Sequence, residues 1–249
     1  MQPFQETIIK VRAFDVDRND RLKISTIFDY LQDAASMHAD NLKVGYDDLI
    51  PRGFFWVLSW AKFEFINFAK FKDELKIKTW GKKQYKLYSL RDFILFSDKE
   101  EVLCKGTTAW LLLDAKSLRP KILTQLFPDV MLLEEENALL DLPHKFSEIL
   151  ETEKLFTKKI MYSDIDLNRH ANNAKYVEMV QDCYDQQFHN EHQMKVLTIS
   201  FLSESKFGDT LEVCKNIQLP GDGADFIEAR NLNTGKIVFQ ASPEWNKFD

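Results

Sequence analysis

The residues best suited to chemistry lie in the stretch DIDLNRHANNAKY, residues 164–176. Asp166, Asn168, His170 and Asn172 occupy alternate positions, so their side chains would share one face of an extended chain. Histidine side chains titrate near neutral pH and can move protons, while carboxylate and amide groups can orient them or bind a reacting carbonyl. Asp and Asn are also common in turns and helix caps. The stretch therefore predicts either a catalytic site or a polar turn that caps a helix.

A strand before this turn and a helix after it would hold these residues in place. The preceding segment LFTKKIMYS is rich in strand-forming residues, and apolar residues recur at helical spacing from Tyr176 to Cys183. Asn172 or Asn173 would cap that helix, and the positive end of the helix would point back at the turn.

The same organisation occurs earlier in the chain, which indicates an internal duplication. DVDRNDRLKISTIFDYLQDA begins at Asp15 and matches DIDLNRHANNAKYVEMVQDC, which begins at Asp164, at a constant offset of 149 residues. Further along, FEFINFAKFKDEL from Phe63 matches ISFLSESKFGDTL from Ile199 at a constant offset of 136. Two ordered matches in the same direction favour duplication over chance.

The two copies differ at the positions that matter most for chemistry. Arg21 stands where the second copy has His170, and Phe68 stands where it has Glu204. Each copy reads as one helix and a run of antiparallel strands, which predicts an α+β unit. We therefore expect one catalytic copy and one copy used for binding.

The expected domain limits follow from this duplication. Residues 1–125 would form the first unit and residues 151–249 the second. Residues 126–150 are acidic and rich in leucine, with Pro128 and Pro143 as punctuation. We expect this linker to contain some helix and to pack across both units.

Composition excludes several classes of protein. The chain has 249 residues, 45% of them hydrophobic, with a formal charge of −6 and a pI near 5.5. Binding to nucleic acid or to an anionic membrane requires a strong positive field, so neither is expected. No segment resembles a signal peptide or a membrane span.

Cysteine and histidine usage also bears on location and metal content. Cys104, Cys183 and Cys214 are odd in number and widely spaced, which predicts neither disulfides nor a zinc site and favours a reducing cytoplasm. His189 and His192 lack further ligands at metal-binding spacing, so a solvated turn is expected there.

DIDLNRHANNAKY resembles the D-x-N-x-H-x-N-N signature of acyl-acyl carrier protein thioesterases, the plant-type fatty acyl hydrolases and their bacterial relatives. The resemblance continues in LTISFLSESKFGDTL and, in the first half, in DVDRNDRL, TWG, LRDFIL and AWLLLDAKSLRP. It implies a tandem of two hotdog units, each a long helix wrapped by an antiparallel sheet. The amino-terminal unit would hold the acyl chain and the carboxy-terminal unit would carry the catalysis.

By the same resemblance the catalytic residues are Asp166, Asn168, His170 and Glu204. The reaction implied is hydrolysis of fatty acyl-acyl carrier protein, with the acyl group on 4′-phosphopantetheine and with no cofactor. One departure is Ser205, which stands where plant members have a cysteine. A cysteine nucleophile is then unavailable at that position, and Cys183 is expected in the core of the protein.

Direct attack of water on the thioester is therefore expected, with either His170 or Glu204 as the base. His170 needs little tuning for this role, whereas Glu204 would have to be buried. Asp166 would orient His170 and Asn168 would position the water or the carbonyl. The backbone N–H groups of Asn173 and Ala174 would hold the oxyanion, an effect of about 3 kcal/mol per donor.

The partner surface and two other activities stay open. Acyl carrier protein is acidic, so the densest basic cluster, Lys82, Lys83, Lys86 and Arg91, is a candidate for its docking site, and a solvated strand rim is the alternative. The resemblance also allows a homodimer. Other functions of hotdog folds are acyl-coenzyme A thioesterase and 3-hydroxyacyl dehydratase, and a non-catalytic acyl-binding protein is the remaining alternative.

Overall fold

The computed structural model describes residues 2–146, 151–216 and 225–248. It divides into two compact units, residues 1–143 (unit 1) and 144–249 (unit 2). None of the described helices is long and apolar enough to cross a bilayer.

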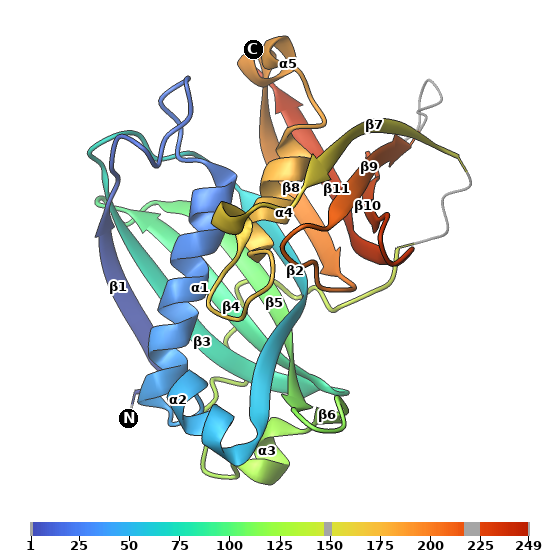
Figure 1. The fold of residues 1–249 in the computed structure, drawn as a ribbon. Helices are drawn as coiled ribbons and strands as arrows, with labels where there is room; N and C mark the ends of the chain where they lie inside the picture. The colour runs from blue at the N-terminus through green and yellow to red at the C-terminus, as the bar shows by residue number, and fades with distance from the viewer. Residues whose placement is uncertain (1, 147–150, 217–224, 249) are drawn as a thin grey trace. The chain divides into compact units, whose positions relative to one another are not determined.

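Unit 1 is an antiparallel sheet with a long helix on one face (Figure 1). Neighbouring strands of this sheet run in the order β1, β3, β4, β5, β2, and the short β6 pairs with β5. The elements of unit 1 are β1 (Phe4–Lys10), α1 (Ile24–Asn41), α2 (Tyr46–Leu49), the 3-10 turn η1 (Ile50–Arg52), β2 (Phe54–Phe65), β3 (Glu74–Tyr85), β4 (Tyr88–Ser97), β5 (Val102–Asp114), β6 (Pro120–Lys121) and α3 (Leu123–Leu126).

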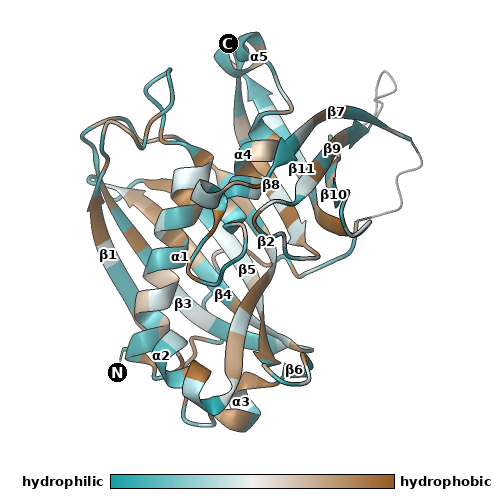
Figure 2. Ribbon diagram, viewed as in Figure 1, coloured by the Kyte–Doolittle hydropathy of each residue, from teal (hydrophilic) through white to brown (hydrophobic). Residues whose placement is uncertain are grey.

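Helix α1 forms because its apolar residues recur at helical spacing and face the sheet. It packs against β1 and β3, and hydrophilic and hydrophobic residues alternate around it (Figure 2). Each large side chain removed from water contributes about 1.5–3 kcal/mol. The buried positions of α1 are Ile24, Ser25, Ile27, Phe28, Leu31, Ala34, Ala35 and His38.

Residues 127–146 of the expected linker differ from the expectation of partial helix, and residues 147–150 lie outside the described residues. From residue 127 to 146 the chain has no helix or strand. Its backbone is instead tied to unit 1, since Leu133 N donates to Gly81 O at 2.9 Å and Trp80 Nε1 donates to Glu136 O at 3.2 Å. Lys62 and Asp141 form an ion pair at 2.6 Å. These contacts with side chains and backbone far away in sequence replace the local bonds of a helix.

Unit 2 repeats the plan of unit 1 with shorter elements. Its strands follow the order β8, β11, β10, β9, β7, all antiparallel. The elements are β7 (Thr152–Lys159), the 3-10 turn η2 (Tyr162–Asp164), α4 (Asn173–Gln181), α5 (Gln186–Glu191), β8 (His192–Phe201), β9 (Thr210–Asn216), β10 (Ile227–Asn231) and β11 (Ile237–Lys247).

Helix α4 buries four large side chains, Tyr176, Val177, Met179 and Val180. It ends at Gln181, so Cys183 lies just beyond it. Both units are thus built from helix and antiparallel sheet, which confirms the predicted α+β class.

The duplication extends to single hydrogen bonds. In unit 1 Leu22 N donates to Ala69 O at 2.8 Å, and in unit 2 Ala171 N donates to Ser205 O at 2.9 Å. Likewise Arg12 N donates to Asp15 Oδ2 at 2.7 Å, and Met161 N to Asp164 Oδ2 at 2.8 Å. These pairs of bonds have the offsets of 149 and 136 residues that relate the two copies in sequence, so the two turns share one local frame.

Candidate active site

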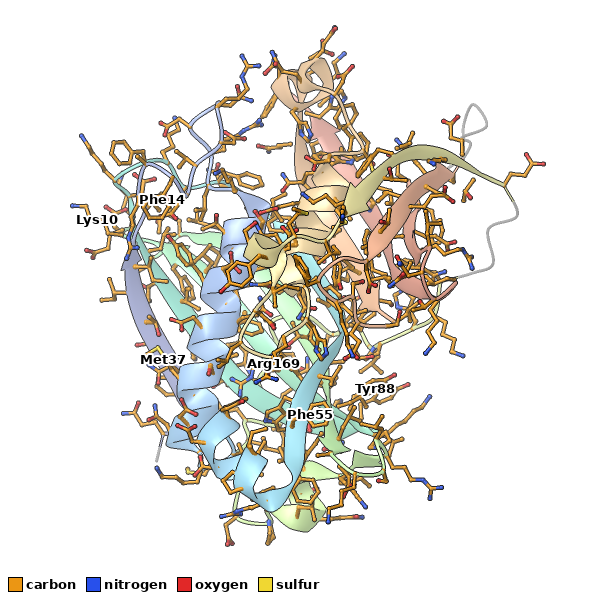
Figure 3. All side chains as sticks on the ribbon, viewed as in Figure 1. Lys10, Phe14, Met37, Phe55, Tyr88 and Arg169 are labelled. Atoms are coloured by element: carbon orange, nitrogen blue, oxygen red, sulfur yellow. The ribbon has the colours of Figure 1, made fainter. Side chains whose placement is uncertain are left out.

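The turn before α4 is closed by its own backbone and by Asp166. Asp166 N donates to His170 O at 2.9 Å, and Arg169 is in the left-handed conformation, with φ of 67°. The side chain of Arg169 is labelled in Figure 3. The Asp166 carboxylate accepts from Asn168 N at 2.8 Å and from His170 N at 3.4 Å. The Asp166 carboxylate thus holds the backbone of the turn and fixes the position of the His170 backbone.

The His170 imidazole meets Glu204, a residue that follows strand β8. Nε2 of His170 lies 2.9 Å from Oε2 of Glu204, and their side chains are 32% and 54% exposed. A carboxylate can only accept, so Nε2 carries the hydrogen of this contact. Nδ1 of the neutral ring is then the nitrogen with a lone pair.

The meeting of His170 and Glu204 follows from the backbone bonds between their two segments. Ala171 N donates to Ser205 O at 2.9 Å, which joins the residues that directly follow His170 and Glu204. Ile160 N donates to Asp209 O at 2.8 Å and Gly208 N donates to Ile160 O at 2.9 Å. The turn and the loop after β8 therefore form one platform.

Lys206 is a member of the site that the sequence analysis missed. Its Nζ lies 3.3 Å from Oε1 of Glu204, so the two carboxylate oxygens face Lys206 and His170 respectively. Lys206 is 63% exposed, and an exposed ion pair adds at most about 1 kcal/mol. The sequence signal was its position two residues after Glu204.

The start of α4 is capped by Asn172, whose side chain accepts from Ala174 N at 2.9 Å. This bond corrects the expectation that the Ala174 N–H is available for an oxyanion. The side-chain amide of Asn168 lies 3.5 Å from the Asp166 carboxylate, and Asn168 is exposed. Its second amide hydrogen can point to solvent, which makes Asn168 the better candidate donor.

Ser205 and Tyr176 lie beneath the exposed pair. Ser205 is fully buried, and its hydroxyl has no hydrogen-bond partner of normal geometry among the described residues. Burial raises the pKa of Tyr176, and the neighbouring Ser205 partly lowers it. A fully buried serine with no base bonded to it is unsuited to act as a nucleophile.

The thiol of Cys183 is also unsuited to nucleophilic attack. Burial is the main cause that raises its pKa, to about 12, and Lys215 partly opposes this. A thiol with such a pKa stays protonated at neutral pH, and only the thiolate is a good nucleophile.

The matching turn of unit 1 has the same backbone hydrogen bonds but lacks the histidine and the glutamate. Asp17 accepts from Asn19 N at 2.8 Å and from Arg21 N at 3.0 Å, as Asp166 does in unit 2. Arg21 Nε forms an ion pair with Asp17 Oδ2 at 3.3 Å, and Phe68 takes the place of Glu204. Among the described residues of this turn, no histidine is paired with a carboxylate.

The expected docking cluster of four basic residues is not one surface, and two of its members require correction. Lys82 is 2% exposed and its Nζ lies 3.0 Å from Asp92 Oδ2. Arg91 donates to His38 Nδ1 at 3.0 Å, and burial together with Arg91 lowers the pKa of His38 to about 4. Only Lys83 and Lys86 are exposed.

Comparison with known proteins agrees with this architecture. Residues 3–129 match the acyl-ACP thioesterase N-terminal domain, and residues 148–247 match the acyl-ACP thioesterase C-terminal domain. An acyl-ACP thioesterase from Bacteroides thetaiotaomicron has a TM-score of 0.86 at 20% identity, with 98% of each chain covered. The 12:0-ACP thioesterase from Umbellularia californica has a TM-score of 0.83 at 17% identity, with 100% of this chain and 99% of that chain covered.

The curated relatives are longer than this chain. Oleoyl-acyl carrier protein thioesterase 2, chloroplastic, of Arabidopsis thaliana is 24% identical over 242 residues, which is 90% of this chain and 66% of that protein. Palmitoyl-acyl carrier protein thioesterase, chloroplastic, of Cuphea hookeriana is 21% identical over 254 residues, which is 94% of this chain and 60% of that protein. The chain spans less than two thirds of the length of either relative.

The solved structures establish the class of the protein as the hotdog fold that was predicted. Since the two domain matches together cover most of the sequence, the chain belongs to the acyl-ACP thioesterase family.

Proposed function

We propose that the protein hydrolyses the thioester of fatty acyl-acyl carrier protein and releases the free fatty acid. The observation that carries this proposal is the contact of 2.9 Å between His170 Nε2 and Glu204 Oε2, at the edge of a turn that the family match covers. The contact orients an imidazole with one free nitrogen, which is the requirement for activating water.

In the proposed reaction His170 Nδ1 takes a proton from water as the water oxygen bonds to the thioester carbon. The negative charge moves to the carbonyl oxygen, where the amide of Asn168 donates to it. The carbon–sulfur bond then breaks, and the thiolate takes the proton back from His170. Glu204 holds the imidazolium through Nε2, and Asp166 keeps the turn closed.

A Glu204→Gln variant distinguishes the two candidate bases. Glu204 is 54% exposed and therefore lacks the burial that a carboxylate base would need. The glutamine amide oxygen can still accept from Nε2 but does not stabilise the imidazolium by charge. We expect kcat to fall about 10- to 100-fold, measured by thiol release. A loss as large as that of His170→Ala would instead make Glu204 the base.

A Ser205→Ala variant tests whether an acyl-enzyme is formed. The buried hydroxyl has no bonded base, and its removal deletes a polar group without a partner of normal geometry in the described chain. We expect kcat within about twofold of the parent and an unchanged or higher melting temperature. An acyl group found on Ser205 by mass spectrometry would contradict direct water attack.

We also propose that unit 1 holds the acyl chain. Arg21 and Phe68 occupy the positions of His170 and Glu204 in an otherwise conserved local frame, so the first copy has lost the groups needed for water activation. The predicted limits of 1–125, 126–150 and 151–249 belong to this proposal.

The decisive experiment is thiol release by the purified protein from a set of acyl-acyl carrier proteins, run beside the same acyl groups on coenzyme A. Fast release from the carrier protein and slow release from coenzyme A would support the proposal. Release from coenzyme A alone would place the protein among other hotdog thioesterases, and dehydration with the thioester intact would make it a dehydratase. No reaction with either substrate would favour a binding protein.

A further inference from the structure

An open groove of about 570 Å³ lies on unit 1 where β1 ends and the turn before α1 begins. Lys10, which lines the groove, and Phe14 of the adjoining turn are labelled in Figure 3. The lining residues are Ile8, Ile9, Lys10, Val11, Arg12, Ala13, Phe71 and Lys72.

The groove is rigid because two segments are bonded across its base. Val11 N donates to Asp73 O at 2.9 Å, and Lys72 N donates to Val11 O at 3.1 Å. Phe71 N donates to Asp20 Oδ1 at 3.0 Å. The turn and the loop between β2 and β3 therefore present one surface with a fixed shape.

The cations of this surface project to solvent. Lys10, Arg12 and Lys72 line the groove. Arg18 lies in the adjoining turn and Lys70 in the loop between β2 and β3. All five side chains are exposed, and none forms an ion pair with a carboxylate of the described chain. We call these five residues the basic rim.

Three carboxylates around the basic rim are engaged in hydrogen bonds or an ion pair within unit 1. Asp73 accepts from Lys70 N at 2.8 Å, and Asp20 accepts from the backbone of Phe71. Asp17 pairs with Arg21, and Glu74 is the cross-strand neighbour of Lys10. Residues 10–23 and 70–74 together contain seven Lys or Arg and five Asp or Glu, so this surface has a local net charge of +2 although the chain as a whole carries −6.

Apolar side chains accompany the cations. Ile8 and Phe14 are each 67% exposed, and Phe71 is 41% exposed. The Arg12 guanidinium lies 5.7 Å from the centre of the Phe14 ring, and Lys72 Nζ lies 5.1 Å from that of Phe71. Exposed rings beside cations are typical of a binding surface rather than of a solvated rim.

The second copy shows that three of the five rim cations are not needed for the local frame, whereas Lys10 and Lys70 correspond to Lys159 and Lys206 there. Arg12, Arg18 and Lys72 correspond to Met161, Leu167 and Gly208.

Lys72 has φ of 75° and its counterpart Gly208 has φ of 89°. Glycine is the residue suited to this conformation, and a lysine costs about 1 kcal/mol there. The strained lysine points to a use for its charge.

We propose that the groove and the basic rim form the docking surface for the acidic acyl carrier protein, in place of the cluster around Lys82. This inference rests on the proposed function. Carboxylates and apolar side chains on one face of the carrier would match the cations and exposed rings of unit 1. A concave, rigid surface suits a folded protein better than a flat lipid surface.

The test removes three charges in an Arg12→Gln/Arg18→Gln/Lys72→Gly variant, in which position 72 takes the residue type of the second copy. We expect KM for acyl-acyl carrier protein to rise about tenfold with kcat unchanged, and the KM difference to shrink at high salt. KM for the same acyl group on N-acetylcysteamine should change less than twofold.

A Lys99→Gln/Lys116→Gln/Arg119→Gln variant is the matched control, because it removes three exposed charges elsewhere on unit 1. It should keep the KM for the carrier protein. Melting temperatures of both variants would show that each is folded.

Three outcomes would overturn the docking surface. The first is an unchanged KM for the carrier protein in the rim variant, and the second is a raised KM in a Lys83→Gln/Lys86→Gln variant instead. The third is loss of binding to phosphatidylglycerol vesicles by the rim variant while its KM for the carrier stays normal, which would make the surface a membrane contact.

Failure of the proposed function gives a different pattern. If the parent protein hydrolyses no thioester, anisotropy of labelled holo-acyl carrier protein still measures docking. Weaker binding by the rim variant than by its control would then support the surface without the reaction.

Discussion

Replacing His170 with alanine should lower kcat for thioester hydrolysis by about a thousandfold. The imidazole is held by Glu204 through Nε2, which leaves Nδ1 as the proposed proton acceptor. Without it the water molecule has no positioned base, while the substrate surface and Asn168 remain. KM should therefore change much less than kcat, because the lost interaction acts in the transition state. Thiol release from acyl-acyl carrier protein at saturating substrate measures both.

His189→Ala is a suitable control for this loss. His189 also belongs to unit 2 and is half-buried, but its Nε2 contacts the backbone oxygen of Gln181 at 2.9 Å, away from the turn. Its replacement should leave kcat within about twofold. Undiminished hydrolysis by a folded His170→Ala protein would refute the catalytic assignment.

The local elements of the site could be predicted because they depend on short-range patterns. Alternating Asp and Asn residues indicated the turn, and the apolar spacing after Asn172 indicated α4. The pairing of His170 with Glu204 could not be predicted in this way. It depends on a backbone bond between Ala171 and Ser205, residues far apart in sequence, and only the family resemblance pointed to Glu204.

The misplaced docking cluster has a similar physical origin. Charge density in GKKQYKLYSLR predicted a basic surface, but the strand register shifts between Gly81 and Gln84 and sends neighbouring side chains to different environments. Lys82 donates hydrogen bonds to Asp92 and to the backbone oxygen of Leu139, and Arg91 donates to His38. Ion pairs and hydrogen bonds of this kind depend on tertiary structure, which charge counting does not describe.

Residues 127–146 of the acidic linker were misjudged for the same reason. Its leucines and glutamates favour a helix when they are taken alone. In the structure the backbone oxygen of Glu136 accepts from the Trp80 indole, and its carboxylate pairs with the ammonium group of Lys78. The backbone N–H of Leu133 donates to Gly81 O. The tertiary contacts outweigh local propensity.

The cytoplasmic location and the homodimer stay predictions.

A Lys82→Met variant should lose about 3–5 kcal/mol of unfolding free energy. Lys82 donates to Asp92 Oδ2 at 3.0 Å and to Leu139 O at 2.8 Å, and it is almost fully buried. The methionine fills similar space but leaves the Asp92 carboxylate buried without its cation. The bonds from Thr107 and from Ala138 N, at 2.7 and 2.6 Å, compensate only in part. Urea denaturation at pH 7.5 measures the loss, and Lys83→Met at the exposed neighbouring position is the control.

The pH dependence of this loss gives a second, independent test. Burial raises the pKa of Asp92, and Lys82 opposes that rise, so the pKa should climb further in the variant. A carboxyl group with a higher pKa in the folded state stabilises the fold below its unfolded pKa, near 4, and loses this as the pH rises through the folded value. The deficit of Lys82→Met should therefore be smaller at pH 5 than at pH 8. Adding Asp92→Asn should remove the pH dependence and recover part of the stability, because the amide oxygen can still accept from Ala138 N. An equal deficit at both pH values would mean that Asp92 does not titrate between pH 5 and pH 8 in the variant.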